Sequence, residues 1–449
     1  MDKAEAKKIV NNYSFPTEGG SYMGGIENRP ILAKSIDRTV TDTEGKEYID
    51  FQSGQMGAAL GHQHPRMIKR ITETMKTMFH SSNTMLNVPR LRLHERIGKL
   101  LPRLPRSVFL VSGSDSIEAA IDLARKATGG LDVLGFHAGL HGSTSYLTRS
   151  LSFNWNRRKH AVVAPATTAI MAPYCYRCPL GLKSPECSFK CLDISLELAD
   201  ANFTSKPAAM IAEPILSAGG VIVPPKGYYK KLKRELEMRD MLLIFDESQT
   251  CLGKTGKVFG YEHEEVTPDI LTMSKHFGGG LPISAVCTTD EIAQKAVDNG
   301  YFATRSHATD PLLCAAGEES IDIVVEEDLA SRSAHIEKKI KGAFEEMAKE
   351  HEMIGDIRGR GVLLGIELVK DRETKEPAND ALAKIFNYSL EHGLIFQSRG
   401  TRGMLNVIRL VPPMTSTDEE VDRALSILND AIDEASKTLG KKTSAAAAE

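Results

Sequence analysis

Short apolar runs alternate with amphipathic stretches through the middle of the chain, from about residue 65 onward. The apolar runs span residues 107–111, 132–136, 208–212, 241–245 and 270–273. The stretches between them carry apolar side chains at helical spacing, as at Ile117, Ala120, Ile121 and Ala124. Strands buried on both faces have this continuous apolar character, and the helices that connect them cover the sheet. The pattern predicts an α/β fold with a large, mostly parallel sheet.

The two ends of the chain follow a different pattern. Turn residues 42–45 separate two strand-like stretches, 30–40 and 47–51, and predict a hairpin. After residue 329 the pattern predicts a long helix to 350, a strand at 361–368, a helix at 380–392 and a final helix from 417. Helices mixed with a few strands indicate a second, smaller α+β domain.

The predicted organisation therefore has four parts. Residues 1–64 form an N-terminal segment of the smaller domain, 65–328 the large domain, and 329–440 the rest of the smaller domain. Residues 441–449 are low in complexity, and we expect a disordered tail there.

Charge and hydropathy exclude several classes of partner. The 449 residues include 56 basic and 59 acidic side chains, for a net charge of −3, so no basic field for nucleic acid or an anionic membrane is expected. No apolar run approaches the roughly 20 residues that span a bilayer, and the first residues lack a signal-peptide core. We therefore expect a cytoplasmic protein.

Four of the seven cysteines lie close together in sequence, at Cys175, Cys178, Cys187 and Cys191. Without a secretion signal, this clustering argues against a disulfide framework and raises the possibility of a structural zinc site. The spacing is not a standard zinc pattern, however, and reduced thiols that pack the loop are the favoured interpretation. The sequence leaves both open.

A lysine and an aspartate carry the most informative chemistry. Asp246 directly follows a buried strand, where α/β sheets place their ligands, and Lys275 follows the next strand and precedes three glycines. A lysine in such a position is usually a solvated surface residue. The pair, however, matches the needs of pyridoxal phosphate, whose aldehyde forms a Schiff base with an amine and whose ring nitrogen requires a carboxylate.

A phosphate site is predicted at the start of the helix that follows the first apolar run. Gly113 and Ser114 stand there, where backbone amides at a helix N-terminus can hold a phosphate. An ordinary helix cap is the alternative interpretation of the same residues.

With these residues in place, the chain resembles the class III, or subgroup II, aminotransferases, which are fold-type I pyridoxal phosphate enzymes. The stretch from Asp246 to Lys275 is similar to the family's central signature over about thirty residues, and the likeness extends over nearly the whole chain. It implies that Lys275 binds the cofactor aldehyde, that Asp246 faces the ring nitrogen, and that Gln249 lies near the ring hydroxyl. His141 and Leu140 would flank the cofactor. Ser306 would reach the phosphate of a neighbouring subunit, which implies a homodimer or a dimer of dimers.

Within the family, the closest resemblance is to dialkylglycine decarboxylase. It implies that Gln55 binds a departing carboxylate and that Arg409 binds the substrate carboxylate. The expected reaction is a decarboxylation-dependent transamination of an α,α-disubstituted amino acid, with a pyruvate-like 2-oxo acid as acceptor. Ordinary transamination of an amino acid or amine is the alternative, and a non-catalytic protein with the same fold is a remote one.

The chain departs from the decarboxylase at three pocket positions. Leu140 replaces a stacked aromatic ring, Ser143 a larger apolar residue, and Ala218 a serine. The loss of the ring at Leu140 weakens the positioning of the cofactor, and the three changes alter the substrate pocket but leave the cofactor chemistry unchanged. The same resemblance predicts a K⁺ or Na⁺ site at Asp310, with Asn83 nearby, whereas a helix cap before Pro311 is the alternative interpretation.

Overall fold

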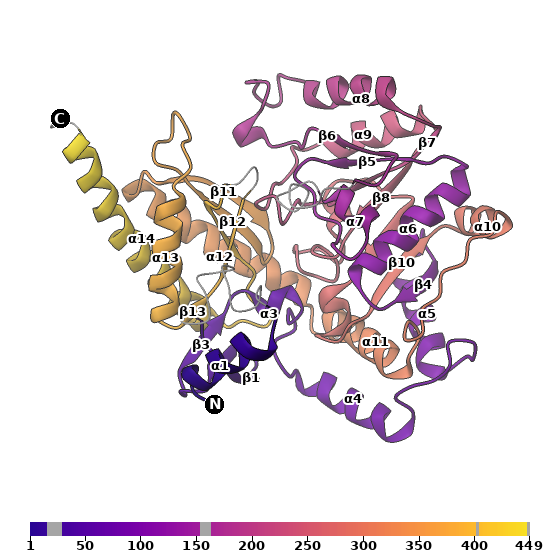
Figure 1. Ribbon diagram of the computed structural model, residues 1–449, viewed down its shortest axis with the longest axis horizontal. Coiled ribbons are helices and arrows are strands. Elements are labelled where there is room, and N and C mark those ends of the chain that lie inside the picture. The colour runs from indigo at the N-terminus through magenta and orange to yellow at the C-terminus, as the bar shows by residue number, and fades with distance from the viewer. Residues whose placement is uncertain (16–28, 153–162, 401–403, 447–449) are drawn as a thin grey trace.

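A seven-stranded sheet forms the centre of the larger lobe in the computed structural model, which describes residues 1–15, 29–152, 163–400 and 404–446 (Figure 1). The strands are β4 (Arg106–Leu110), β5 (Asp132–Phe136), β6 (Thr167–Ile170), β7 (Pro207–Ala212), β8 (Leu242–Asp246), β9 (Ile270–Met273) and β10 (Ser284–Thr288). Their order is β4-β10-β9-β8-β7-β5-β6, and only β10 runs antiparallel to its neighbours β4 and β9. The predicted mostly parallel sheet is confirmed.

Alternate residues of the sheet strands face different layers of helices. In β5, Val133 packs in the apolar cluster that contains Ile121 of α6, whereas Leu134 packs with Leu192 of α8 and Tyr228 of α9. The helices of this lobe are α4 (Pro65–Thr77), α5 (Val88–Leu100), α6 (Gly113–Thr128), α7 (Tyr146–Leu151), α8 (Lys190–Asn202), α9 (Tyr228–Glu237), α10 (Asp290–Asp298) and α11 (Pro311–Glu326). Short 3₁₀ turns are η3 (Cys175–Arg177), η4 (Gly260–His263) and η5 (Lys275–Gly278).

Segments from both ends of the chain build the smaller lobe. One sheet has the order β1-β2-β3-β13 and another the order β11-β12-β15-β14. Their strands are β1 (Leu32–Ile36), β2 (Thr39–Asp42), β3 (Glu47–Asp50), β11 (Ile354–Arg360), β12 (Leu363–Leu368), β13 (Leu394–Ile395), β14 (Gln397–Arg399) and β15 (Val407–Leu410). The helices are α1 (Lys3–Tyr13), α3 (Ser53–Met56), α12 (Leu329–Glu350), α13 (Asn379–Glu391) and α14 (Asp418–Ala446). The parallel pairing of β3 with β13 joins the N-terminal segment to the C-terminal one.

Two local predictions differ from the structure. The stretch 30–40 is not one strand, because Asp37 has a positive φ of 49° and the chain turns there between β1 and β2. Helix α14 continues to Ala446, into the stretch from residue 441 where the sequence suggests a disordered tail. Residues 447–449 lie outside the described part of the chain. Within that part, no helix is both long and apolar enough to cross a lipid bilayer.

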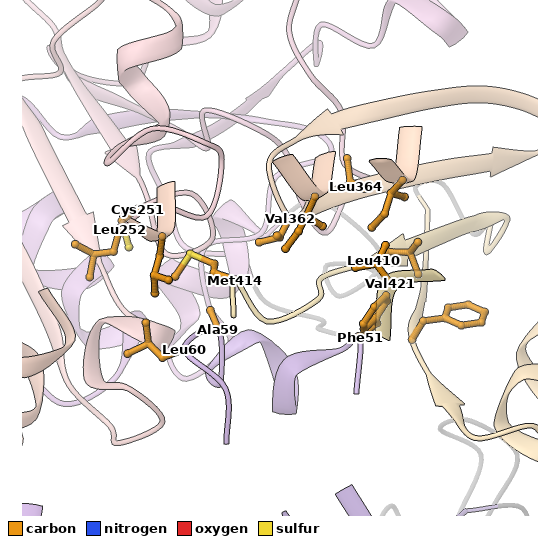
Figure 2. Close-up of a cluster of buried hydrophobic side chains, with 14 of the residues drawn as sticks. Phe51, Ala59, Leu60, Cys251, Leu252, Val362, Leu364, Leu410, Met414 and Val421 are labelled. Atoms are coloured by element: carbon orange, nitrogen blue, oxygen red, sulfur yellow. The ribbon is translucent and has the colours of Figure 1, made fainter. Parts of the chain in front are cut away.

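Apolar side chains from both lobes meet in one cluster (Figure 2). Phe51 and Leu410 of the smaller lobe and Leu252 of the larger lobe belong to it, and Met414 lies between them in the view. Beside this cluster, two backbone hydrogen bonds join the N-terminal and C-terminal segments of the smaller lobe, from Val411 N to Phe51 O at 2.7 Å and from Met414 N to Ala59 O at 2.7 Å.

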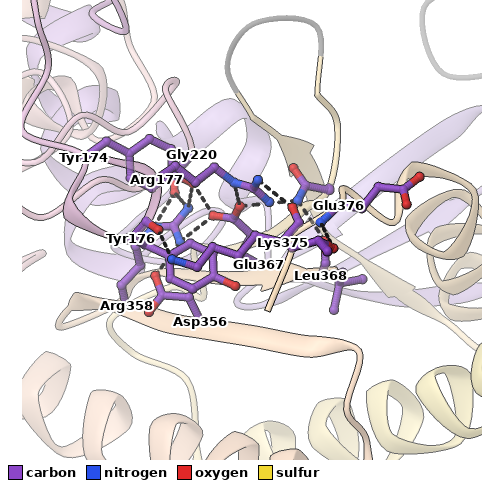
Figure 3. A network of polar contacts seen from close by, with 12 residues as sticks. Tyr174, Tyr176, Arg177, Gly220, Asp356, Arg358, Glu367, Leu368, Lys375 and Glu376 are labelled. Atoms are coloured by element: carbon purple, nitrogen blue, oxygen red, sulfur yellow. Dashed lines mark hydrogen bonds and ion pairs between the residues drawn. The ribbon is translucent and has the colours of Figure 1, made fainter. Parts of the chain in front are cut away.

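A buried polar network also joins the lobes (Figure 3). Glu367 of β12 is fully buried, accepts hydrogen bonds from Tyr174 and Arg177 of the larger lobe, and forms a 2.7 Å ion pair with Arg358. Arg358 also donates to the backbone oxygen of Gly220 at 2.6 Å. Burial alone would raise the pKa of Glu367, but the charge of Arg358 and the donors Tyr174 and Arg177 hold it below its ordinary value.

We expect Phe51→Ala to lower the free energy of unfolding by about 3–5 kcal/mol, because Phe51 is only 1% exposed and its ring packs in the apolar cluster that both lobes share. Denaturant unfolding followed by circular dichroism measures the loss. The matched control is Phe15→Ala, at a ring that is 80% exposed, which should change stability by less than about 0.5 kcal/mol. Equal effects of the two substitutions would contradict this account of the junction.

Candidate active site

A cavity of about 420 Å³ opens at the carboxyl edge of the large sheet, the edge at which parallel strands place ligands. Nine of the thirteen residues assigned from the sequence line it together. They are Gln55, Gly113, Ser114, Leu140, His141, Ala218, Asp246, Gln249 and Lys275.

The carboxylate of Asp246 is buried at the end of β8 and surrounded by donors. His141 Nδ1 lies 2.9 Å from Asp246 Oδ2, and Ser248 N donates to Oδ1 at 3.1 Å. Burial alone would raise the pKa of Asp246, but these donors and the nearby ammonium of Lys275 hold it below its ordinary value. Asp246 therefore remains an anion at neutral pH, as a partner for a protonated ring nitrogen must.

Lys275 faces the same cavity from the start of η5, directly after β9. Its backbone has a φ of 55°, a left-handed conformation that a lysine seldom adopts and that strained active-site residues often show. Burial lowers the pKa of its ammonium, and the negative charges of Asp246 and Glu213 offset part of that effect. A lysine with a lowered pKa is closer to the neutral amine that attacks a carbonyl carbon.

The N-terminus of α6 has the features of a phosphate site. Ser112 and Asp115 form a capping box, in which Asp115 N donates to Ser112 Oγ at 3.1 Å. The capping box leaves the first-turn amides of Gly113 and Ser114 to a ligand. A Cβ at Gly113 would lie 2.8 Å from Ser274 Oγ, so a larger residue there would require that hydroxyl to move.

Two residues that line the cavity each have a buried polar atom without a hydrogen-bond partner in the described part of the chain. These atoms are Gln249 Oε1 and His141 Nε2. Such atoms carry a desolvation cost unless a ligand satisfies them. A carboxylate, a lysine amine, a helix N-terminus and an unsatisfied amide therefore surround one cavity, and together they fit pyridoxal phosphate.

Gln55 reaches the cavity from a strained segment of the smaller lobe. Ser53, Gly54, Gln55 and Met56 all have positive φ, at 50°, 48°, 62° and 68°. The segment is held in place because Ser53 Oγ donates to Val411 O at 2.5 Å and Gly54 N donates to Asp50 Oδ2 at 2.8 Å. Strain of this kind persists only where the surroundings over-determine it.

A chain of side-chain contacts connects Gln55 to Arg409. Gln397 Nε2 lies 3.4 Å from Gln55 Oε1, and Gln397 Oε1 accepts a hydrogen bond from Arg409. Arg409 is 1% exposed and donates from Nη1 to Ser217 Oγ at 2.9 Å, beside Ala218 of the cavity wall. The structure thus brings these two predicted residues into one network just outside the cofactor cavity.

Three other predicted residues lie outside the first cavity. Ser143 N donates to Ser114 Oγ at 3.2 Å, so Ser143 lies at the edge of the expected phosphate site. Ser306 and Asp310 line a second cavity of about 470 Å³.

The surroundings of Asp310 differ from the oxygen-rich site expected for an alkali cation. His80 and His307 contact its two carboxylate oxygens at 2.7 and 2.8 Å, and the three ligand atoms lie within 4.8 Å of one another. Asn83 instead donates to Thr304 Oγ1 at 2.9 Å. Asp310 also gives no side-chain cap to α11.

The sequence analysis missed two buried ionisable residues of the site. Glu213, at the carboxyl edge of β7, lines the cavity and accepts from Leu140 N at 3.0 Å, and burial raises its pKa to about 7. Lys254 is fully buried and donates to Met56 O at 3.2 Å, which supports the strained segment, and burial lowers its pKa to about 7. Glu213 directly follows an apolar run as Asp246 does, and that position could have revealed it.

Comparison with protein families identifies the chain. The model of the class-III aminotransferases matches residues 27–432. The chain belongs to the class-III aminotransferases. It is therefore a pyridoxal phosphate-dependent enzyme, and the expectation of a non-catalytic protein is not supported.

Relatives within this family carry several activities. The chain is 34% identical over 411 residues to an uncharacterized aminotransferase of Schizosaccharomyces pombe. The aligned region covers 91% of this chain and 92% of that protein. The chain is 35% identical to a leucine/methionine racemase of Thermococcus litoralis, with 95% of each chain covered. It is 34% identical to the 5-aminovalerate aminotransferase DavT of Pseudomonas aeruginosa, with 90% of this chain and 94% of that protein covered.

Solved structures agree with the fold and the cofactor. An aminotransferase of Bacillus anthracis superposes with a TM-score of 0.89 at 28% identity, covering 97% of this chain and 99% of that chain. An omega transaminase of Pseudomonas jessenii in complex with PMP superposes with a TM-score of 0.84 at 26% identity, covering 92% and 94% of the two chains.

We expect Lys275→Ala to reduce transaminase turnover by at least roughly a thousandfold, because no other amine was found to line the cavity in the described part of the chain. Turnover with pyruvate and a range of amino donors measures the loss, and borohydride should no longer attach the cofactor covalently. Lys257→Ala, at an exposed lysine that donates to Glu262 O, is the matched control and should keep full activity. Turnover by the Lys275 variant at the wild-type rate would overturn the assignment.

Proposed function

We propose that this aminotransferase carries out decarboxylation-dependent transamination of an α,α-disubstituted or related amino acid, with a pyruvate-like 2-oxo acid as acceptor. The observation that carries the proposal is the position of Gln55. Its strained backbone extends the side chain to the cavity, and Gln397 connects it to Arg409. An amide and a guanidinium that lie together beside a cofactor cavity suit the carboxylate of an amino acid.

In this proposal the large lobe supplies the acid–base groups. Pyridoxal phosphate accepts the electron pair that is left when a bond to the substrate α-carbon breaks. Asp246, kept ionised by His141 and Ser248, holds the proton on the ring nitrogen. The amine of Lys275 binds the cofactor between turnovers and moves a proton to or from the reacting carbon. Gly113 and Ser114 bind the phosphate, and Gln249 satisfies its buried oxygen with the ring hydroxyl.

The smaller lobe would choose which bond breaks. Gln55 Oε1 accepts from Gln52 Nε2 at 2.7 Å, so its amide nitrogen is the end that can donate to a ligand. If Gln55 holds the carboxylate perpendicular to the cofactor ring, the bond to carbon dioxide is the one aligned for cleavage. Arg409 then holds the carboxylate of the 2-oxo acid in the second half of the reaction. Leu140, Ser143 and Ala218 leave room for the substrate side chains.

Ordinary transamination without decarboxylation is the second candidate. The similarity to the 5-aminovalerate aminotransferase supports it, and so does the similarity to a leucine/methionine racemase, because racemisation of an amino acid also breaks the bond between the α-carbon and its proton. In that case Lys275 would remove a proton from the α-carbon, and Gln55 would serve only to bind.

The two candidates are separated by 2-aminoisobutyrate, which has no α-hydrogen. With pyruvate as acceptor, we expect equal amounts of carbon dioxide, acetone and alanine, measured by trapped label and chromatography. Gln55→Ala should lower the rate of carbon dioxide release by roughly a hundredfold. Gln294→Ala, on the exposed face of α10, is the matched control and should have no effect. Alanine formed from ordinary amino acids but no carbon dioxide from 2-aminoisobutyrate would overturn the proposal in favour of ordinary transamination.

We expect Arg409→Lys to raise KM for a carboxylate-containing substrate by about 10–100-fold, because a lysine cannot form the paired hydrogen bonds of a guanidinium. Steady-state kinetics with an amino acid and with a primary amine that lacks a carboxylate distinguish a loss of carboxylate binding from a general loss of substrate binding. The amine should be affected little, whereas an equal rise in KM for both donors would contradict carboxylate binding. Arg239→Lys, at a surface ion pair with Asp200, is the control.

We also infer that two copies of the chain share their active sites. Ser306 and the exposed Phe79 line the same second cavity, and Met85 and Leu86 nearby in sequence are 63% and 71% exposed. Exposed apolar side chains of this kind commonly mark an interface. Sedimentation should give at least twice the 49.2 kDa chain mass, and a monomer that is fully active would contradict the shared site.

The predicted alkali cation site at Asp310 has its own test. If the site is used, activity should require K⁺ or Na⁺, and Asp310→Ala should remove that requirement. Full activity in the absence of both ions would exclude a required cation.

A further inference from the structure

Four cysteines converge on one small hollow of the larger lobe, away from the cofactor cavity. Cys175, Cys178, Cys187 and Cys191 all line this hollow and all are free thiols. They come from the η3 turn, the loop after it and the first turn of α8. Each is at least partly exposed, unlike the fully buried Cys251, Cys287 and Cys314.

The backbone of the loop is specialised at the point where it returns to the cluster. Ser188 and Phe189 both have left-handed backbones, with φ of 48° and 61°, and they place Cys187 and Cys191 on either side of the start of α8. Such consecutive left-handed residues are costly for side chains larger than glycine and require support from their surroundings. Lys231 of α9 provides part of it, since its Nζ donates to Ser188 O at 3.1 Å.

A buried hydroxyl next to the thiols points independently to a ligand. Tyr228 is 0% exposed and lines the same hollow, and its OH has no hydrogen-bond partner among the described residues. Neutral thiols accept hydrogen bonds weakly, whereas a metal-bound thiolate carries negative charge and accepts them well. A thiolate at this site would therefore satisfy the hydroxyl.

We propose that Cys175, Cys178, Cys187 and Cys191 bind one structural zinc ion. Four thiolates are a complete tetrahedral ligand set for zinc, and no open position would remain for catalysis. The hollow that they line has a volume of about 20 Å³.

Binding requires the sulfur atoms to move together and to lose their protons. Among the described residues, no three of these four sulfur atoms lie within 4.8 Å of one another. The side chains, which are partly exposed, must therefore rotate to bring the sulfurs around one ion. Burial raises the pKa of the Cys191 thiol to about 11 and also raises that of Cys175, so zinc must displace these protons as it binds.

The site would act on the junction between the lobes. Tyr174, Tyr176 and Arg177, which surround Cys175 in sequence, extend to Glu367, Arg358 and Lys375 of the smaller lobe (Figure 3). A tetrahedral ion would fix this loop on the larger lobe and so fix the donors that hold Glu367. The inferred role is structural and does not depend on which bond the enzyme breaks.

The direct test is the metal content of the purified holoenzyme, measured by plasma mass spectrometry. We expect about one zinc per chain, and cobalt substitution should give the intense visible d–d absorption of a tetrahedral thiolate site, at wavelengths beyond the cofactor bands. Less than about a tenth of a metal ion per chain, with all four thiols reacting freely with a thiol reagent, would overturn the proposal. Disulfides among the four cysteines in the native protein would overturn it equally.

Variants separate loss of the metal from loss of the fold. Cys187→Ser and Cys178→Ser should each lower zinc content at least about tenfold and lower the melting temperature, because three thiolates hold the ion less tightly. Cys287→Ala, at a buried cysteine of β10, is the matched control and should keep full zinc content. Zinc retained at one per chain in the Cys178 and Cys187 variants would exclude these ligands, whatever the variants do to activity.

Discussion

The buried carboxylate of Asp246 sets the conditions for the rest of the active site. An anion in the interior is tolerated only when donors surround it, and here they come from separate parts of the sheet edge: His141 after β5, Ser248 after β8 and the ammonium of Lys275 after β9. Each of these segments must reach the same point, which the parallel arrangement of β5, β7, β8 and β9 provides. Because these donors hold Asp246 ionised, the part of the cavity beside its carboxylate can accept a cationic ring.

The sequence predicted the parts of this site that have a fixed relation to the strands. Asp246 and Lys275 directly follow apolar runs, so their positions followed from the fold class alone. The strand β6 was missed because it is rich in threonine and lies at the edge of the sheet with little burial, whereas the fully buried β10 was missed because its apolar run is only three residues long. Apolar periodicity reports burial, and it fails where a strand is partly exposed or polar.

Residues that depend on long-range contacts could not be predicted in the same way. Gln397 lies between Gln55 and Arg409 only because β14 pairs with β15, some 340 residues after Gln55. Lys254 supports Met56 across the junction of the lobes, and nothing in the local sequence indicates that contact. At Asp310, the resemblance to a known family identified the residue itself. It did not predict the imidazoles of His80 and His307, which contact the carboxylate.

The division of the site between the lobes has a mechanical consequence. Gln55, Gln397 and Arg409 belong to the smaller lobe, whereas Asp246 and Lys275 belong to the larger one (Figure 1). A rotation of one lobe against the other would therefore carry these three side chains together toward or away from the amine of Lys275. A substrate that bridges the two sets would draw the lobes together, and a ligand that contacts only one set would not. How closely the lobes approach would then depend on the distance between the carboxylate and the amino group of the substrate.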